Sequence, residues 1–249
     1  MRITIAIFLG LLVSCGASTT NEKSIKVACA ANMLIAMDSI AVLFEAEHGI
    51  QCNITSGSSG MLTSQIENGA PYDVFLSANM NYPETVYKNG NGGEPVIYAQ
   101  GRLLLVVDKT TNYVSIDEVL NDSKIRRIGM ADNQTAPYGM AASQYLTATG
   151  KKEGLKDRLV IGESIGQINQ YITTGAVDAA FTSYSFKVKN ESGFNYFEVD
   201  PNLFDPINQG AMILNHGSEY NSDASNKLLQ FFSSEKCKGV LNYFGYLTE

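Results

Sequence analysis

Four short stretches of small, uncharged residues stand where an apolar run gives way to a segment with helical spacing. They are residues 31–32, 58–60, 136–139 and 164–166. The first N–H groups of a helix have no partner within the helix and carry about half a positive charge. Several helix starts that converge on one point would bind a small dianion with neutral donors alone. Because one such stretch is more often only a helix cap, the prediction depends on their recurrence.

Because the chain is acidic overall, an anion site must attract its ligand through groups at the site itself. The formal net charge is -7 at pH 7, and no run of Lys or Arg exceeds two residues. An acidic protein repels an anion at long range, so fixed dipoles at the site must attract it. The sequence also shows no basic surface for phosphate backbones, which argues against nucleic acid as a partner.

Alternating strand-like and helix-like segments are expected to position these stretches. Asn32 is a favourable N-cap for the first helix. Ser115 and Glu118 form a capping box, and Pro137 suits the first turn of a helix that ends near Gly150. Strands are expected at residues 25–31, 51–56, 72–78, 102–107, 125–131 and 176–182, and further helices at residues 61–68, 164–175 and 222–244.

This order of elements predicts an α/β protein with two lobes. We expect each lobe to be a mainly parallel sheet flanked by helices, with a ligand cleft between the lobes at the carboxyl ends of the strands. Lobe 1 is expected to contain residues 24–105 and 207–249, and lobe 2 residues 106–206. The apolar strands at residues 102–107 and 211–214 are the expected crossings between the lobes.

The N-terminus has the organisation of an export signal. Arg2 precedes an apolar run over residues 3–13 that is too short to span a bilayer. The residues before Cys15 resemble the lipobox of bacterial lipoproteins, in which the cysteine is lipidated and becomes the mature N-terminus. We therefore predict a signal peptide with a lipobox over residues 1–15, lipidation at Cys15 and a flexible tether over residues 16–24. An ordinary signal peptide that is cleaved nearby, with Cys15 incidental, is the alternative.

The other cysteines do not indicate a metal site. Cys29, Cys52 and Cys237 are odd in number, and their spacing does not fit zinc ligands. Buried free thiols are expected, and a disulfide between Cys29 and Cys52 is the alternative.

The sequence resembles the periplasmic molybdate-binding protein family over nearly all of the mature chain. Residues 30–32, Ala-Ala-Asn, match the end of the family's first strand, and residues 57–60 match its serine-rich turn. The most specific match is residues 65–78, Gln-Ile-Glu-Asn-Gly-Ala-Pro-Tyr-Asp-Val-Phe-Leu-Ser-Ala. Residues 136–139 resemble the turn that supplies a backbone N–H, and Ile165 stands where another backbone donor lies.

This resemblance implies a type II periplasmic-binding-protein fold and a set of ligand contacts. Asn32 and Ser59 would hold a small oxyanion through side chain and backbone, Tyr138 and Ile165 through their N–H groups, and Ser183 would complete the set. The anion itself would be the bound group, with no cofactor and no direct metal-ion ligands.

Three positions depart from the family pattern. Asn32 replaces a serine, Ser183 stands where many members have a tyrosine, and Asn79 replaces an aspartate. An amide oxygen repels an oxyanion and serine reaches less far than tyrosine, so these changes bear on the size of the cavity and the choice of ligand. Sulfate, phosphate or an organic anion is therefore the alternative to molybdate.

The resemblance also implies a transport function. We expect a monomer in the periplasm or cell envelope that captures molybdate and tungstate and delivers them to the permease of an ABC importer. Its contact with the membrane would be through the lipid anchor alone.

An enzymatic alternative would use Ser59 as a nucleophile. Residues 57–60, Gly-Ser-Ser-Gly, do not form the Gly-x-Ser-x-Gly elbow of hydrolases. The two histidines, His48 at a helix end and His216 in a turn, are expected at the surface rather than in a triad.

Two carboxylates inside apolar strands are a second candidate for catalysis. Asp73 and Asp178 could form a catalytic pair, or each could bind hydrogen-bond donors at its own strand end. We expect the second arrangement, and therefore a binding protein rather than an enzyme. A hydrolase or transferase on a similar scaffold is the alternative that a turnover assay would detect.

Overall fold

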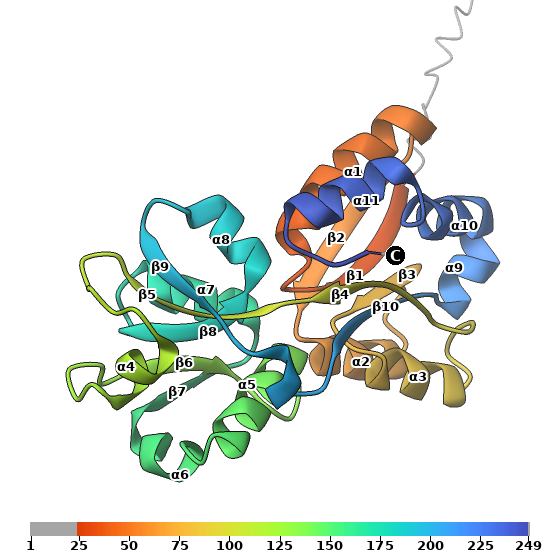
Figure 1. Cartoon of the computed structure of the whole chain (residues 1–249). Helices are drawn as coiled ribbons and strands as arrows, with labels where there is room; N and C mark the ends of the chain where they lie inside the picture. Colours follow the sequence, from red (N-terminus) through yellow and green to blue (C-terminus); the bar gives the residue numbers. More distant parts are fainter. Residues whose placement is uncertain (1–23, 249) are drawn as a thin grey trace, which may run out of the picture.

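The computed structural model describes residues 24–248 and contains two five-stranded sheets flanked by helices (Figure 1). The strand orders are β2-β1-β3-β10-β4 and β7-β6-β8-β5-β9. In each sheet three neighbouring strands run parallel, and the last two run antiparallel to their neighbours. The predicted two-lobed α/β fold is confirmed, and both lobes have the same plan.

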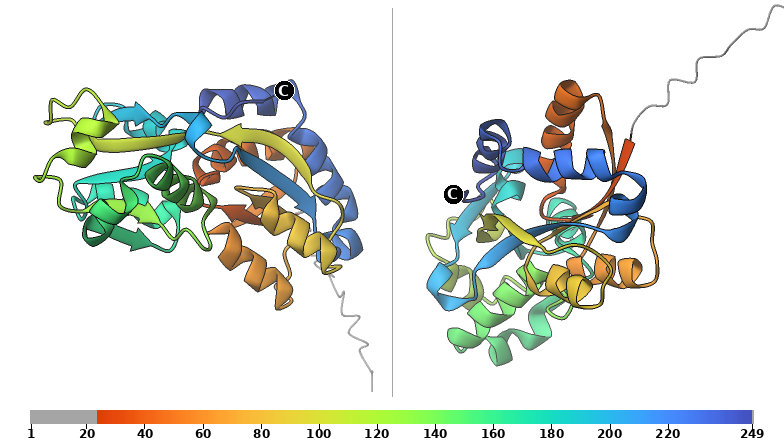
Figure 2. Two further views of the ribbon diagram at one scale, coloured as in Figure 1. Left: turned by 60° about the horizontal axis from the view of Figure 1, so that its bottom comes forward. Right: turned by 90° about the vertical axis from the view of Figure 1, so that its right-hand side faces the viewer.

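The first sheet contains β1 (Ser24–Ala30), β2 (Gln51–Gly57), β3 (Val74–Ser77), β4 (Val96–Gly101) and β10 (Ile207–Ile213). Its helices are α1 (Leu34–His48), α2 (Ser59–Glu67), α3 (Asn81–Lys88), α9 (Asn215–Tyr220), α10 (Ser222–Phe231) and α11 (Glu235–Tyr243). Figure 2 shows this lobe beside the other one, with extended strands running between them.

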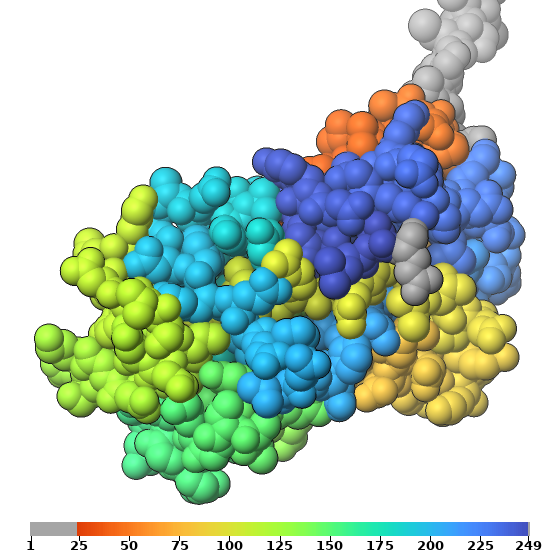
Figure 3. All heavy atoms as spheres, viewed as in Figure 1, coloured from red at the N-terminus to blue at the C-terminus, as the bar shows by residue number. Residues whose placement is uncertain are grey.

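The second sheet contains β5 (Leu103–Asp108), β6 (Ile128–Ala131), β7 (Leu159–Gly162), β8 (Ala179–Ser183) and β9 (Phe194–Glu198). Its helices are α4 (Ile116–Asn121), α5 (Pro137–Ala148), α6 (Lys152–Leu155), α7 (Ile165–Thr173) and α8 (Tyr184–Asn190), with 3-10 turns at Lys156–Arg158 and Pro201–Leu203. The all-atom view shows this second lobe, in green and cyan, packed against the first (Figure 3).

The strands that the sequence did not predict are β4, β7 and β9, and all three lie at sheet edges. An edge strand is partly exposed, so it lacks the continuous apolar run of a central strand. Helices α3, α6, α8 and α9 were also not predicted, and His216, which was expected in a turn, lies in α9. The expected helix over residues 222–244 is two helices, because Ser234 ends the first segment and caps α11 by accepting a hydrogen bond from the N–H of Cys237.

The chain crosses between the sheets at two places, of which the first lies at the start of the expected segment 102–107 and the second precedes residue 207, where lobe 1 was expected to resume. β4 ends at Gly101 and β5 begins at Leu103, so the first crossing is at Arg102 and the expected lobe boundary at residue 105 falls inside β5. The second crossing follows β9 and precedes Ile207. Residues 211–213 pair with β3 in the middle of the first sheet, so the crossing predicted at residues 211–214 is wrong. Apolar runs mark buried central strands, whereas the crossings, Arg102 and residues 199–206, contain no continuous apolar run.

The remaining cysteines are free thiols within residues 24–248. In the parallel ladder Cys29 lies opposite Ser56 and Cys52 lies opposite Ile25, so the two cysteines do not face each other. The expectation of free thiols is met, and the pairing of Cys29 with Cys52 is not observed. Cys15, the signal peptide and all of the tether except Ser24 lie outside the described residues, and Ser24 itself begins β1.

No helix within residues 24–248 has the length and hydropathy needed to cross a bilayer.

Candidate functional site

A small pocket lies between the lobes where the predicted turns meet. It leaves about 10 Å³ for the centre of a water-sized sphere, roughly the room that one water molecule requires. Four of the five predicted binding residues line it: Asn32, Ser59, Tyr138 and Ile165. The other lining residues are Ala30, Ala31, Gly57, Ser58, Ala78, Ala136 and Pro137.

The start of α2 supplies one N–H group to this pocket. The Ser58 hydroxyl caps the helix by accepting from the N–H of Met61 at 3.4 Å, and the N–H of Gly60 donates to the carbonyl of Thr135 at 2.9 Å. Among the described residues, no partner engages the N–H of Ser59, the first residue of α2. The first turn of the helix therefore leaves its Ser59 N–H for a ligand.

The starts of α5 and α7 supply two more N–H groups from the second lobe. Pro137 begins α5 and has no N–H, so Tyr138 carries the first N–H of that helix. The hydroxyl of Ser164 caps α7 by accepting from the N–H of Gln167 at 3.3 Å, which leaves the N–H of Ile165. Within residues 24–248, no group of the protein accepts from the N–H of Tyr138 or Ile165.

Asn32 lines the pocket, but it does not cap the first helix as the sequence had predicted. α1 begins at Leu34 with Met33 as its N-cap, and no side chain caps it. The Asn32 amide nitrogen donates to Gln209 Oε1 at 2.8 Å and to Tyr246 Oη at 3.0 Å, which uses both of its hydrogens. Among the described residues no group accepts from the backbone N–H of Asn32, so this donor is available to an anion, and the side-chain contact stays a prediction.

The Ser59 hydroxyl has a free hydrogen. Its oxygen accepts from the N–H of Ala78 at 3.0 Å, and the side chain is almost completely buried. A hydroxyl that accepts one hydrogen bond can still donate its own hydrogen. Ser59 can therefore give an anion two donors, its N–H and its O–H.

Ser183 is not one of the residues that line the pocket. Its hydroxyl lies 2.9 Å from the hydroxyl of Ser185, and Ser185 donates to the carbonyl of Asn32 at 2.8 Å. Since Ser185 has only one hydrogen and gives it to Asn32, Ser183 must donate to Ser185. In this structure the Ser183 hydroxyl supports the Asn32 turn through Ser185, and its direct contact with the anion stays a prediction.

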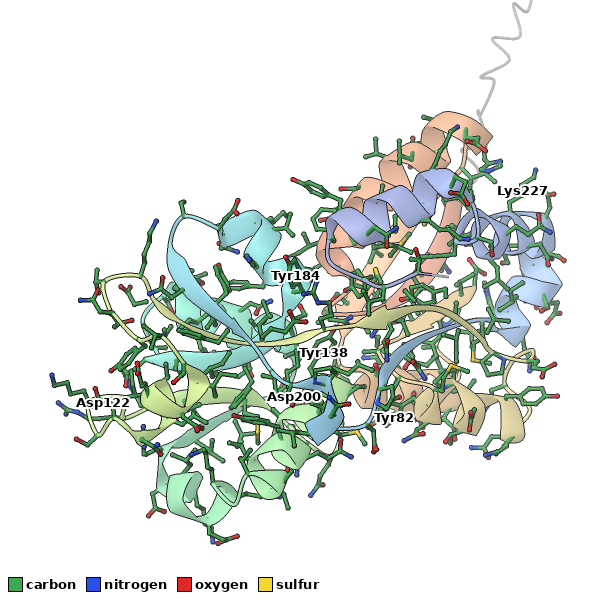
Figure 4. The ribbon with its side chains drawn as sticks, in the orientation of Figure 1. Tyr82, Asp122, Tyr138, Tyr184, Asp200 and Lys227 are labelled. Atoms are coloured by element: carbon green, nitrogen blue, oxygen red, sulfur yellow. The ribbon has the colours of Figure 1, made fainter. Side chains whose placement is uncertain are left out.

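No charged side chain is among the residues that line the pocket. The only titratable side chain there is Tyr138, and burial raises its pKa well above the ordinary value for tyrosine. Figure 4 shows Tyr138 between the two lobes. A Cβ on Gly101 would lie 2.1 Å from the Tyr138 hydroxyl oxygen, so the close contact of this ring with the first crossing requires glycine at position 101.

The groups proposed for catalysis do not meet. Asp73 is fully buried and accepts from His216, from Asn221 and from the N–H of Lys26. Asp178 lies in the other lobe and accepts from the N–H groups of Arg126 and Arg127. Each carboxylate therefore binds donors at its own strand end, as expected. His216 is partly buried against Asp73 rather than on the open surface, and neither histidine lines the pocket with Ser59.

Comparison with known proteins agrees with this geometry. A model of the family described as bacterial extracellular solute-binding proteins matches residues 25–247. The molybdate-binding protein ModA of Azotobacter vinelandii is 34% identical over 249 aligned residues, which cover 98% of this chain and 96% of that protein. ModA of Rhodobacter capsulatus is 32% identical and is matched over 89% of this chain and 87% of its own length.

Solved structures show the same fold. The periplasmic molybdate-binding protein of Azotobacter vinelandii aligns with a TM-score of 0.85 and 30% identity, over 90% of this chain and 99% of that chain. The sulfate-binding protein SubI of Mycobacterium tuberculosis aligns with a TM-score of 0.75 over 90% of this chain and 86% of that one, but at 13% identity it shows the shared fold alone. The resemblance that the motifs indicated is confirmed, and the chain belongs to the family of bacterial extracellular solute-binding proteins.

Proposed function

We propose that this protein captures molybdate in the pocket between its lobes and delivers it to the permease of an ABC importer. The observation that carries the proposal is the convergence of four N–H donors, from Asn32, Ser59, Tyr138 and Ile165, on a pocket without a charged side chain. The similarity to two molybdate-binding proteins over most of the chain supports the choice of anion.

The donors explain how a protein of net charge -7 would hold a dianion. Three of them stand at helix starts, where the helix dipole favours negative charge, and the pocket excludes most water. Four N–H groups and the Ser59 hydroxyl suit a fully deprotonated tetrahedral anion, because each of them can donate a hydrogen bond to an anion oxygen. Cavity size would then separate molybdate and tungstate from smaller anions.

We propose a binding function without catalysis, and a monomer in the periplasm.

Titration calorimetry tests this function directly. Purified protein lacking residues 1–15 should bind molybdate and tungstate at one site, and should bind sulfate and phosphate much more weakly. Tighter binding of sulfate or phosphate would show that the departures at Asn32 and Ser183 have changed the ligand. If none of the four anions binds, the proposed function is wrong, and turnover of ester and phosphoester substrates should be assayed next.

A lipid anchor at Cys15 would keep the protein at the membrane, and the change Cys15→Ala tests it. We expect the variant to appear in the soluble envelope fraction, or to accumulate unprocessed, because lipidation and the cleavage that depends on it require the thiol. Cell fractionation with immunoblotting measures both effects. The matched control is Cys52→Ala, which removes another thiol and should fractionate like the parent. Equal fractionation of all three proteins would rule out lipidation at Cys15.

A further inference from the structure

Besides the bond from Ser185 to Asn32, two hydrogen bonds join the lobes beside the anion pocket. The N–H of Gly60, in α2 of the first lobe, donates to the carbonyl of Thr135 in the second lobe at 2.9 Å. The hydroxyl of Tyr82, in α3 of the first lobe, donates to the carbonyl of Gln134 at 2.7 Å. Figure 4 shows Tyr82 at the boundary between the lobes. We call these two bonds the clasp.

The clasp is adjacent to the pocket on both sides. Gly60 directly follows Ser59, and Thr135 directly precedes Ala136, and both Ser59 and Ala136 line the pocket. The lobes cannot separate at the pocket without breaking the bond between Gly60 and Thr135. The state of the clasp is therefore coupled to the access of an anion to its donors.

The loop that accepts both bonds is held in shape within its own lobe. Asp132 Oδ1 accepts from the N–H of Gln134 at 2.8 Å, and the carbonyl of Asp132 accepts from the N–H of Ala136 at 2.9 Å. These bonds fix two successive carbonyls, those of Gln134 and Thr135, in orientations that meet donors of the first lobe. Burial and the nearby Asp132 carboxylate raise the pKa of Tyr82, so its hydroxyl keeps its hydrogen at neutral pH.

A side chain at position 60 would crowd the clasp. A Cβ on Gly60 would lie 3.0 Å from the Cα and the carbonyl oxygen of Thr135 and 3.0 Å from the Tyr82 hydroxyl. Contacts this short require a neighbour to shift. Gly60 does not have a positive φ and lies in the first turn of α2, so alanine would fit the helix itself and would be opposed only by Thr135 of the other lobe and by the Tyr82 hydroxyl, which both take part in the clasp.

We propose that Tyr82 is a positioning residue that holds the cleft closed over the bound anion and so slows its release. Tyr82 does not line the pocket, and it acts through the loop that leads into α5 and the Tyr138 N–H. This inference rests on the proposed capture of an oxyanion. It adds one contact, between Tyr82 and Gln134, that does not touch the anion but determines how long the anion stays bound.

The first test is Tyr82→Phe, with stopped-flow kinetics of molybdate binding. We expect the dissociation rate constant to rise about 2- to 10-fold, the range for loss of one hydrogen bond between neutral groups, and the association rate constant to change less than about 2-fold. An anion can enter only while the clasp is open, so loss of the clasp should affect release more than entry. The matched control is Tyr87→Phe, in the same helix, where the side chain is 47% exposed; it should leave both rate constants unchanged.

The second test is Gly60→Ala. We expect a larger rise in the dissociation rate constant than for Tyr82→Phe, because the new Cβ opposes both bonds of the clasp. The melting temperature of the ligand-free protein should be equal or higher, because alanine is the better helix former. A residue with only a structural role would lower both affinity and stability, so the opposite signs distinguish the two roles.

A third measurement does not depend on the ligand. Exchange of the Gly60 amide hydrogen, followed by NMR in ligand-free protein, should be faster in Tyr82→Phe than in the parent and in Tyr87→Phe. If amide exchange and anion release in Tyr82→Phe both match the control, the inference is wrong. Absence of molybdate binding by the parent protein would instead contradict the proposed function, and the amide exchange would still decide whether Tyr82 holds the lobes together.

Discussion

Molybdate at 100 times its dissociation constant should raise the melting temperature of the mature protein by roughly 5 to 11 °C. A ligand at that concentration stabilises the folded state by about 2.7 kcal/mol when the unfolded chain does not bind it. For a chain of 249 residues, each kcal/mol corresponds to about 2 to 4 °C. Differential scanning calorimetry or fluorimetry resolves a shift of this size.

The anion panel and a salt control make this result specific. Tungstate should give a similar shift, and sulfate and phosphate at the same concentration a much smaller one, because the pocket would select by size. Chloride at matched ionic strength controls for screening of the acidic surface. A larger shift with sulfate or phosphate than with molybdate would reassign the ligand. If all the anions raised the melting temperature equally and only slightly, the proposed oxyanion site would be wrong.

Replacing Ser59 should have the second large effect. Ser59→Ala removes the hydroxyl that donates to the anion, and we expect affinity for molybdate to fall by about 1 to 3 kcal/mol, or roughly 5- to 150-fold. The same hydroxyl accepts from the buried N–H of Ala78, so the ligand-free protein should also lose about 1 kcal/mol of stability. Calorimetric titration well below the melting temperature separates the loss of affinity from the loss of stability.

Ser64→Ala is the matched control for this change. Ser64 lies in the same helix and is exposed, so its replacement should alter neither affinity nor melting temperature appreciably. An affinity in Ser59→Ala equal to that of Ser64→Ala would remove the Ser59 hydroxyl from the site. The backbone donor of Ser59 would then have to be tested separately, since an alanine retains the N–H.

Local signals in the sequence predicted the starts of α5 and α7, whereas α2 begins two residues before the predicted residue 61 and Asn32 does not cap α1. Ser58 and Ser164 cap α2 and α7, and Pro137 begins α5, as their residue types indicate. These signals act over three or four residues, so they are readable without knowledge of the fold. The same holds for the central strands, whose continuous apolar runs record burial on both faces. The edge strands β4, β7 and β9 are partly exposed and were not predicted, whereas the edge strand β2 was.

Which hydrogens remain for a ligand was decided only by tertiary contacts. The amide of Asn32 is occupied by Gln209 and Tyr246, which are 177 and 214 residues away in the sequence. The hydroxyl of Ser183 is used by Ser185, whose own hydrogen goes to Asn32 in the other lobe. A side chain has a fixed number of donors, and a partner brought close by folding can use them before a ligand does.

The sequence by itself therefore determined the two-lobed α/β plan, the starts of α5 and α7 and the uncharged character of the site. The tertiary structure decided where the chain crosses between lobes, how the donors are shared, and that Tyr82 of one lobe meets the loop carrying Gln134 of the other. The physical reason is the distance along the chain over which each kind of interaction acts. Caps, turns and hydrophobic periodicity depend on neighbours along the chain, whereas hydrogen-bond competition and contact between lobes depend on neighbours in space.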